Sequence, residues 1–313
     1  MTTVPALPAA ETAALTRRVT LLSVITAAAL VAMKAAAWAA SGSVALLASL
    51  ADSGLDLVAS LATFFAVRYA VAPPDPEHRF GHGKAEAFAS LFQGGLVFAS
   101  AALIGREAIV DLIHPRPLQQ EGWAIAVMAV STLMTAGLIA AQTQVLRRTG
   151  SVAVSGDRAH YASDVASNLV ALAGVAAAAL LGLANCDAIA ALIVAAVLLW
   201  GAIGVFREAA NQLLDHELSP EARDRIVEIV TRDARIAGVH QLRTRAAGPF
   251  VHMQMHVDLD PDLSLTEAHE VLVEAEKRVL EEFPSADILM HADPRGHAEP
   301  HGGAFAETSR MEA

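Results

Sequence analysis

Long apolar segments dominate this sequence and restrict what it can fold into. A helix needs about 20 apolar residues to cross a bilayer, and six segments reach that length: 19–40, 44–70, 85–113, 122–146, 159–183 and 188–208. They are too long and too continuous for the strands of a membrane barrel, which is the other structure that satisfies its backbone hydrogen bonds in lipid. The sequence therefore predicts a membrane α-helical fold with six transmembrane helices.

The character of the chain changes near residues 215–220. Hydrophobic residue types make up 54% of the chain, against roughly 45–50% in soluble domains, and the excess lies before this boundary. We expect a tail at 1–16, a six-helix transmembrane domain at 17–211, a linker at 212–217, a soluble domain at 218–293 and a disordered tail at 294–313.

The soluble part has the pattern of a small α/β domain. Amphipathic helices are predicted at 221–232 and 264–283, and strands at 239–245, 250–260 and 287–291. In the second strand, apolar residues alternate with polar ones, as in a strand with one buried face. Ser264 and Glu267 have the spacing of a capping box at the start of the second helix. The predicted order is αββαβ.

Basic residues predict the orientation in the membrane. Nearly all of them fall on one side of the six-span map: Arg17, Arg18, Arg68, Arg79, Lys84, Arg147, Arg148, Arg158 and Arg207. Because cytoplasmic loops are enriched in Lys and Arg, both termini and the soluble domain are expected in the cytoplasm. The first span follows Arg17–Arg18 without a cleavage site, so we expect no cleaved signal peptide. A net charge of −11 argues against nucleic acid as a partner.

Charged residues at bilayer depth are costly and indicate function. Asp52 and Asp56 in the second span, and His160 and Asp164 in the fifth, are each four residues apart and so share a helix face. Three carboxylates and one imidazole suit zinc or a similar first-row ion. The alternative is a set of structural hydrogen bonds, but two carboxylates on one helix repel unless a cation or protons neutralise them.

Two further groups of metal-binding residue types lie outside the spans. The link between the second and third spans holds Asp75, His78 and His82, and the soluble domain holds His240, His256, His269, His291 and Asp293. A metal-free, His-rich loop and solvated surface histidines are the alternatives. With only Cys186 in the chain, a thiolate cluster is excluded.

Three stretches resemble the cation diffusion facilitator family, and in particular its bacterial zinc and ferrous-iron efflux branch. They are Ala51-Asp52-Ser53-Gly54-Leu55-Asp56, the run Phe80-Gly81-His82-Gly83-Lys84-Ala85-Glu86, and His160-Tyr161-Ala162-Ser163-Asp164. The resemblance covers about residues 17–293. It implies a homodimer in the inner membrane that exchanges metal for protons by alternating access, with a metallochaperone-like cytoplasmic domain.

The resemblance also implies roles for particular residues. It places the transport site at Asp52, Asp56, His160 and Asp164, and a loop site at Asp75, His78 and His82. It implies a binuclear site at the dimer interface, with His240, His256 and Asp293 on one ion, His269 and His291 on the other, and Asp293 bridging. Lys84 and Asp215 would form an interlock at the dimer contact; an exposed, weakly contributing pair is the alternative.

The sequence leaves several points open. His160 favours zinc over manganese, but Fe2+, Cd2+, Co2+ and Ni2+ remain candidates. An intramembrane metalloenzyme and a membrane metal sensor are the rival functions, although the sequence has no His-Glu-x-x-His motif. Lys34 in the first span either snorkels to the interface or pairs with a carboxylate. His216, His252, His297 and His301 are expected to be surface histidines, with weak metal capture as the alternative for His297 and His301.

Overall fold

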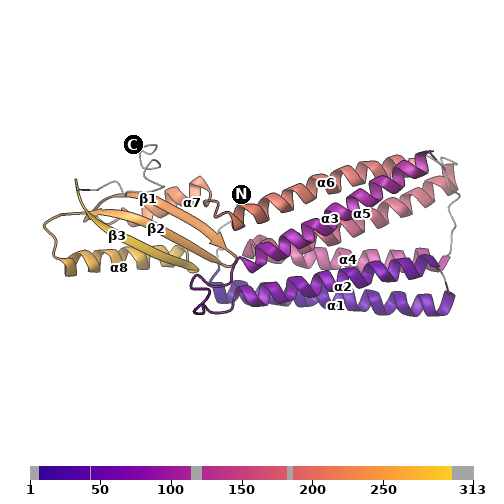
Figure 1. Cartoon of the computed structure of the whole chain (residues 1–313), viewed down its shortest axis with the longest axis horizontal. Helices are drawn as coiled ribbons and strands as arrows, with labels where there is room; N and C mark the ends of the chain where they lie inside the picture. Colours follow the sequence, from indigo (N-terminus) through magenta and orange to yellow (C-terminus); the bar gives the residue numbers. More distant parts are fainter. Residues whose placement is uncertain (1–6, 43, 114–121, 182–185, 298–313) are drawn as a thin grey trace.

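The computed structural model describes residues 7–42, 44–113, 122–181 and 186–297. A bundle of long helices and a small α/β domain lie end to end (Figure 1). The bundle helices are α1 (Ala9–Ser41), α2 (Val44–Ala70), α3 (Ala85–Ile113), α4 (Gly122–Thr149), α5 (Val152–Leu181) and α6 (Cys186–Leu213). Most of the predicted disordered tail, including His301, lies outside the described residues, as do residues 1–6 of the predicted N-terminal tail.

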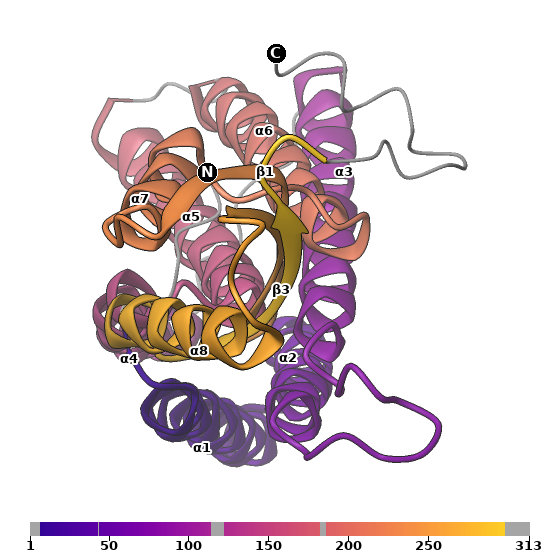
Figure 2. The same cartoon turned by 90° about the vertical axis from the view of Figure 1, so that its left-hand side faces the viewer.

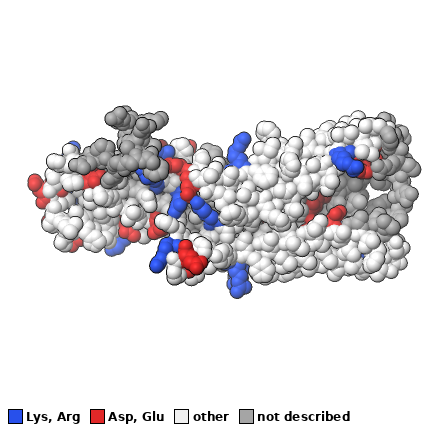
Figure 3. Space-filling model, in the orientation of Figure 1, with Lys and Arg blue, Asp and Glu red and all other residues white. Residues whose placement is uncertain are grey.

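The helical membrane region is confirmed. By length and composition, α1, α2, α3, α4 and α6 are apolar enough to cross a membrane. Large apolar side chains such as Leu133 and Trp200 are 74% and 80% exposed on the bundle, which suits contact with lipid rather than water. On the face shown in Figure 3, charged side chains gather over the α/β domain and its junction with the bundle, while the surface of the bundle is mostly uncharged.

Two helices begin well before their predicted starts. Helix α1 starts at Ala9 instead of residue 19, and α5 starts at Val152 instead of residue 159. The prediction for α5 failed because its first turns are polar and were assigned to a link. Two serines at this end of α5 are hydrogen-bonded inside the bundle: Oγ of Ser151, the residue before the helix, donates to Glu86, and Oγ of Ser155 donates to Glu208. Hydropathy alone cannot recognise a polar segment that is buried against polar partners.

Helix α5 is the central element of the bundle. It contacts each of the other five bundle helices, while α1 packs on α2 and α4, and α3 packs on α6. The end-on view shows this arrangement behind the α/β domain (Figure 2). Residues on different faces of α5 can therefore reach several helices at once.

The α/β domain has the predicted αββαβ order. Its elements are α7 (Pro220–Val230), β1 (Ile236–Ala247), β2 (Phe250–Leu259), α8 (Leu265–Glu282) and β3 (Ala286–Pro294). Strand β2 is central, antiparallel to β1 and parallel to β3. The predicted capping box at Ser264 and Glu267 is present.

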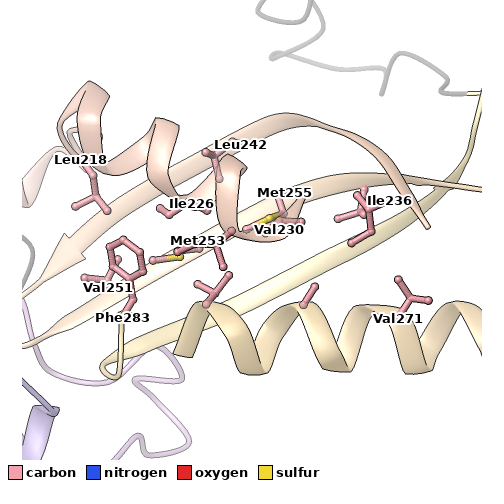
Figure 4. Packing of buried hydrophobic residues seen from close by; sticks show 14 of the residues in the cluster. Leu218, Ile226, Val230, Ile236, Leu242, Val251, Met253, Met255, Val271 and Phe283 are labelled. Carbon is pink, nitrogen blue, oxygen red and sulfur yellow. The ribbon is translucent and has the colours of Figure 1, made fainter. Parts of the chain in front are cut away.

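Alternation along β2 creates two different sheet faces. Val251, Met253, Met255 and Val257 point into a core that α7 and α8 cover, together with residues such as Val271 (Figure 4). The intervening polar residues, among them His252 and His256, point to the opposite face. That face is free of helices within the described part of the chain and carries three of the four histidines of the domain's candidate site: His240, His256 and His291.

Candidate metal centres

The first candidate centre lies within the bundle, where α2 faces α5. Ligand atoms of Asp56, His160 and Asp164 all lie within 4.8 Å of one another. His160 Nε2 is 3.0 Å from Asp56 Oδ1 and 3.9 Å from Asp164 Oδ2. His160 is buried, and Asp56 and Asp164 are partly exposed. Three side chains from two helices thus converge on a small volume that is suited to one cation.

Asp52, the fourth predicted ligand, is not in this group. It is exposed on α2, one turn before Asp56. The next residue, Ser53, accepts a hydrogen bond of 2.7 Å from Lys34 Nζ of α1, which also donates to the carbonyl oxygen of Ser49. Lys34 is therefore anchored to α2 beside the site. A helix face is predictable from spacing, whereas the distance between two helices at each turn is not.

The second candidate centre is the loop that joins α2 to α3. Asp75, His78 and His82 have ligand atoms within 4.8 Å of one another. His78 Nδ1 is 3.1 Å from Asp75 Oδ1, and His82 Nε2 is 3.2 Å from Asp75 Oδ2. Backbone N–H groups of His78 and Glu77 donate to the Asp75 carboxylate and lower its pKa. The carboxylate is thereby held ionised, as a cation ligand must be.

The third candidate centre is the helix-free face of the sheet. Asp293 Oδ2 lies 3.2 Å from His240 Nε2 and 2.8 Å from His256 Nδ1, and its Oδ1 lies 3.2 Å from His291 Nε2. Strand register produces this row, because His256 pairs with His240 in β1 and with His291 in β3. Asp293 thus presents Oδ2 to His240 and His256 and Oδ1 to His291, which is the geometry that a bridging carboxylate needs.

His269 is apart from this cluster. It is exposed on α8, and α8 covers the other face of the sheet. The predicted pairing of His269 with His291 therefore does not occur within one chain in the described structure. If His269 shares an ion with His291, the two residues must come from different subunits.

The junction between the domains contains the predicted pair of Lys84 and Asp215. Lys84 Nζ is 2.9 Å from Asp215 Oδ1, and Arg245 of β1 is 3.2 Å from Asp215 Oδ2. Burial opposes ionisation of Asp215, but the hydrogen bond from Lys84 and the charge of Arg245 outweigh it, so its pKa is lowered. The carboxylate thus stays charged near neutral pH and connects Lys84, at the end of the α2–α3 loop, to Arg245 of β1.

Close backbone packing reinforces this junction. A Cβ atom on Gly83 would overlap the carbonyl oxygen of Ala247, and one on Gly248 would lie 2.6 Å from the carbonyl oxygen of Gly83. Only glycine fits at either position. His78 and His82 of the loop site line a cavity of about 390 Å³ between the two domains.

His252 was expected to be a surface histidine, but it lies at the junction. Its side chain is only 11% exposed, its Nδ1 is 3.0 Å from Asp287 Oδ2, and its ring meets that of Phe80 from the α2–α3 loop. The alternation of β2 indicated its face. The contact of His252 with the α2–α3 loop depends on how the two domains pack, and a local sequence pattern cannot predict that packing. His216 is exposed, as expected.

Sequence reasoning also missed a buried polar network around Asp157 of α5. Asp157 accepts hydrogen bonds from Ser23 of α1, Gln93 of α3 and Gln142 of α4. One sequence feature could have indicated Asp157: it lies three residues before His160. Hydropathy, however, places it in the link between the fourth and fifth predicted spans.

Comparison with known proteins gives consistent matches along the chain. A family model described as the cation efflux transmembrane domain matches residues 20–214, and one described as the cytoplasmic domain of cation efflux proteins matches residues 218–295. The cation-efflux pump FieF of Yersinia enterocolitica is 40% identical over 282 residues, which cover 90% of this chain and 94% of the relative. FieF of Citrobacter koseri is 38% identical over 291 residues, with coverage of 93% and 97%.

Among solved structures, a putative zinc transporter CzrB in its zinc form matches with 31% identity and a TM-score of 0.25. That match covers 27% of this chain and 98% of the solved chain.

Proposed function

The chain belongs to the cation diffusion facilitator family, and from this premise we propose that it exports divalent metal ions, zinc foremost, in exchange for protons. One observation carries the proposal: Asp56, His160 and Asp164 converge between two helices of an apolar bundle. Ionisable residues at such depth are costly unless they bind an ion or protons.

The ligand chemistry favours zinc. One imidazole with carboxylates is a borderline-soft set that suits Zn2+ and disfavours oxygen-preferring ions such as Mn2+. Fe2+, Cd2+, Co2+ and Ni2+ are compatible with the same ligands. Asp52 would complete a fourth position after a small movement of its side chain or of α2, one turn away from Asp56.

Proton coupling follows from the ligands themselves. Carboxylates and imidazole bind a metal only when deprotonated, so metal and protons compete for the same atoms. An unperturbed imidazole also titrates near neutral pH. If the site opens to each side of the membrane in turn, protons that move inward drive metal outward.

The proposal includes a homodimer with cytoplasmic termini in the inner membrane. The partly exposed cluster around Asp293 would lie at the contact between the two subunits, where His269 of the partner subunit, near the start of α8, would add a ligand. The distribution of basic residues, which meet the cytoplasm at the ends of the spans, supports this orientation. Metal bound at the subunit interface would regulate transport and would not itself be transported.

Metal flux separates this proposal from its two rivals. With equal zinc on both sides of proteoliposomes, an imposed pH difference should drive zinc toward the acidic compartment. Asp56→Ala should abolish that movement, because it removes a ligand from the cluster. Glu107→Ala is the matched control: it removes an exposed acid of α3 outside all three centres and should leave transport intact.

Three results would contradict the proposal. Zinc that distributes identically whatever the pH difference would indicate a channel or uniporter. An absence of flux in the wild type, with zinc bound to the cytoplasmic domain, would favour a membrane metal sensor. Normal flux in Asp56→Ala would remove the intramembrane cluster from the transport path.

A further inference from the structure

A second buried acid lies one helical turn from the candidate transport site. Asp157 is fully buried on α5, three residues before His160 and toward the α/β-domain end of that helix. Its Oδ2 accepts from Ser23 Oγ at 2.7 Å and from Gln142 Nε2 at 2.8 Å, and its Oδ1 accepts from Gln93 Nε2 at 2.9 Å. One carboxyl group thus joins α5 to α1, α3 and α4.

The partners of Asp157 are neutral. Among the described residues, no Lys or Arg forms an ion pair with it, and α1, α3 and α4 present only a hydroxyl and two amides. The ionisable groups that act on it electrostatically are His160, Tyr161 and Asp56. A carboxylate inside an apolar bundle without a cation beside it is costly, so a proton or a nearby metal ion is the natural way to neutralise it.

The amide partners leave room for a proton. Gln93 and Gln142 are fully buried, yet their Oε1 atoms have no hydrogen-bond partner in the described structure. A half-turn of either amide would present Oε1 instead of Nε2 to Asp157. A carboxylate cannot donate to that oxygen, whereas a protonated carboxyl group can. The same side chains therefore accommodate Asp157 with or without a proton.

We propose that Asp157 is a proton-carrying group of the transport cycle that is separate from the metal ligands. This inference rests on the proposed metal–proton exchange. When a divalent cation binds at Asp56, His160 and Asp164, its charge stabilises the Asp157 carboxylate across one helical turn. The Asp157 O–H bond then breaks and the proton leaves to water on the cytoplasmic side. When the metal departs on the outer side, Asp157 takes up a proton there.

Proton release on zinc binding tests this role. Purified full-length protein in weakly buffered detergent solution is titrated with zinc while a pH-indicator dye counts the protons released. Asp157→Asn should release about one proton fewer per zinc ion than the wild type, because the Asn amide cannot ionise. The amide can still donate a hydrogen bond to Oε1 of Gln93 or Gln142, so the network is preserved. Ser23→Ala removes one hydrogen bond of the network without removing an ionisable group. At a pH above the midpoint of proton release in this variant, it should release as many protons as the wild type.

A second variant addresses the case in which Asp157→Asn does not fold. Gln142→Leu removes an amide that stabilises the carboxylate, so protons should be released from Asp157 at higher pH. The pH midpoint of zinc-linked proton release should therefore move upward. A residue that only holds the helices together would change stability without moving this midpoint.

The outcomes separate the two proposals. If the wild type releases no protons on zinc binding and a pH difference drives no zinc, metal–proton exchange itself is wrong. Suppose that the wild type releases protons on zinc binding and that a pH difference drives zinc. The role of Asp157 is then overturned if Asp157→Asn releases as many protons as the wild type. If Asp157→Asn does not fold, the role is overturned if Gln142→Leu keeps the wild-type midpoint. That role is also overturned if Ser23→Ala loses as many protons as Asp157→Asn.

Discussion

At the scale of single residues, His160 is the most informative side chain. It is the only imidazole in the intramembrane cluster of Asp56, His160 and Asp164, and its Nε2 is the atom nearest to Asp56. Its nitrogen is the one ligand in the cluster that an oxygen-preferring ion does not favour. Selectivity is therefore expected to depend on this residue more than on either carboxylate.

Replacement of His160 by Asp should relax selectivity toward manganese, since every ligand would then be an oxygen. Zinc and manganese uptake into proteoliposomes, measured at matched concentrations, gives the ratio of rates. The Glu107→Ala variant controls for reconstitution. Unchanged relative rates in His160→Asp would show that selectivity is determined elsewhere.

At the scale of elements, α8 depends on its N-terminal cap. Ser264 Oγ accepts from the backbone N–H of Glu267, and the Glu267 side chain accepts from the backbone N–H of Ser264. Residues of α8, among them Val271, Ala275 and Val279, supply one wall of the α/β-domain core. Loss of the cap should therefore weaken the whole domain and not only the first turn of the helix.

Ser264→Ala should destabilise the α/β domain by about 1 kcal/mol, the usual cost of an N-cap. Urea unfolding of residues 218–297 measures this, because the domain has a hydrophobic core of its own. Ser264→Asp retains a capping oxygen and should lose much less. Equal losses in the two variants would mean that the hydroxyl is needed for something other than capping.

At the scale of the whole molecule, the junction makes the two domains one unit. The pair of Lys84 and Asp215, the contact of Arg245 with Phe80, and the backbone packing of Gly83 on Ala247 connect the α2–α3 loop to β1. These contacts lie between the loop site and the sheet-face site. We therefore propose that metal bound to the α/β domain acts on the bundle through this junction.

Zinc should promote dimerisation of residues 218–297. Ions bound only by the associated state favour that state by mass action. Sedimentation with and without zinc tests this, and His269→Ala should weaken the response if its ligand is shared between subunits. A domain that remains monomeric in zinc would contradict the interface proposal and leave the transport proposal untouched.

Features that depend on local periodicity could be predicted from the order of the amino acids. Apolar length predicted the membrane helices, alternation predicted the two faces of β2, and spacing of four placed His160 and Asp164 on one face of α5. These features are readable because helix and strand geometry fixes the direction of each side chain relative to its neighbours in the chain.

The packing of helices and strands shows which of the predicted residues meet. It separated Asp52 from Asp56, His160 and Asp164, placed His269 on the far side of the sheet, and brought His252 to the domain junction. It also buried Asp157 against three helices. The physical reason is that contacts between elements depend on how far one helix or domain lies from another when packed, and no local repeat in the chain encodes that distance.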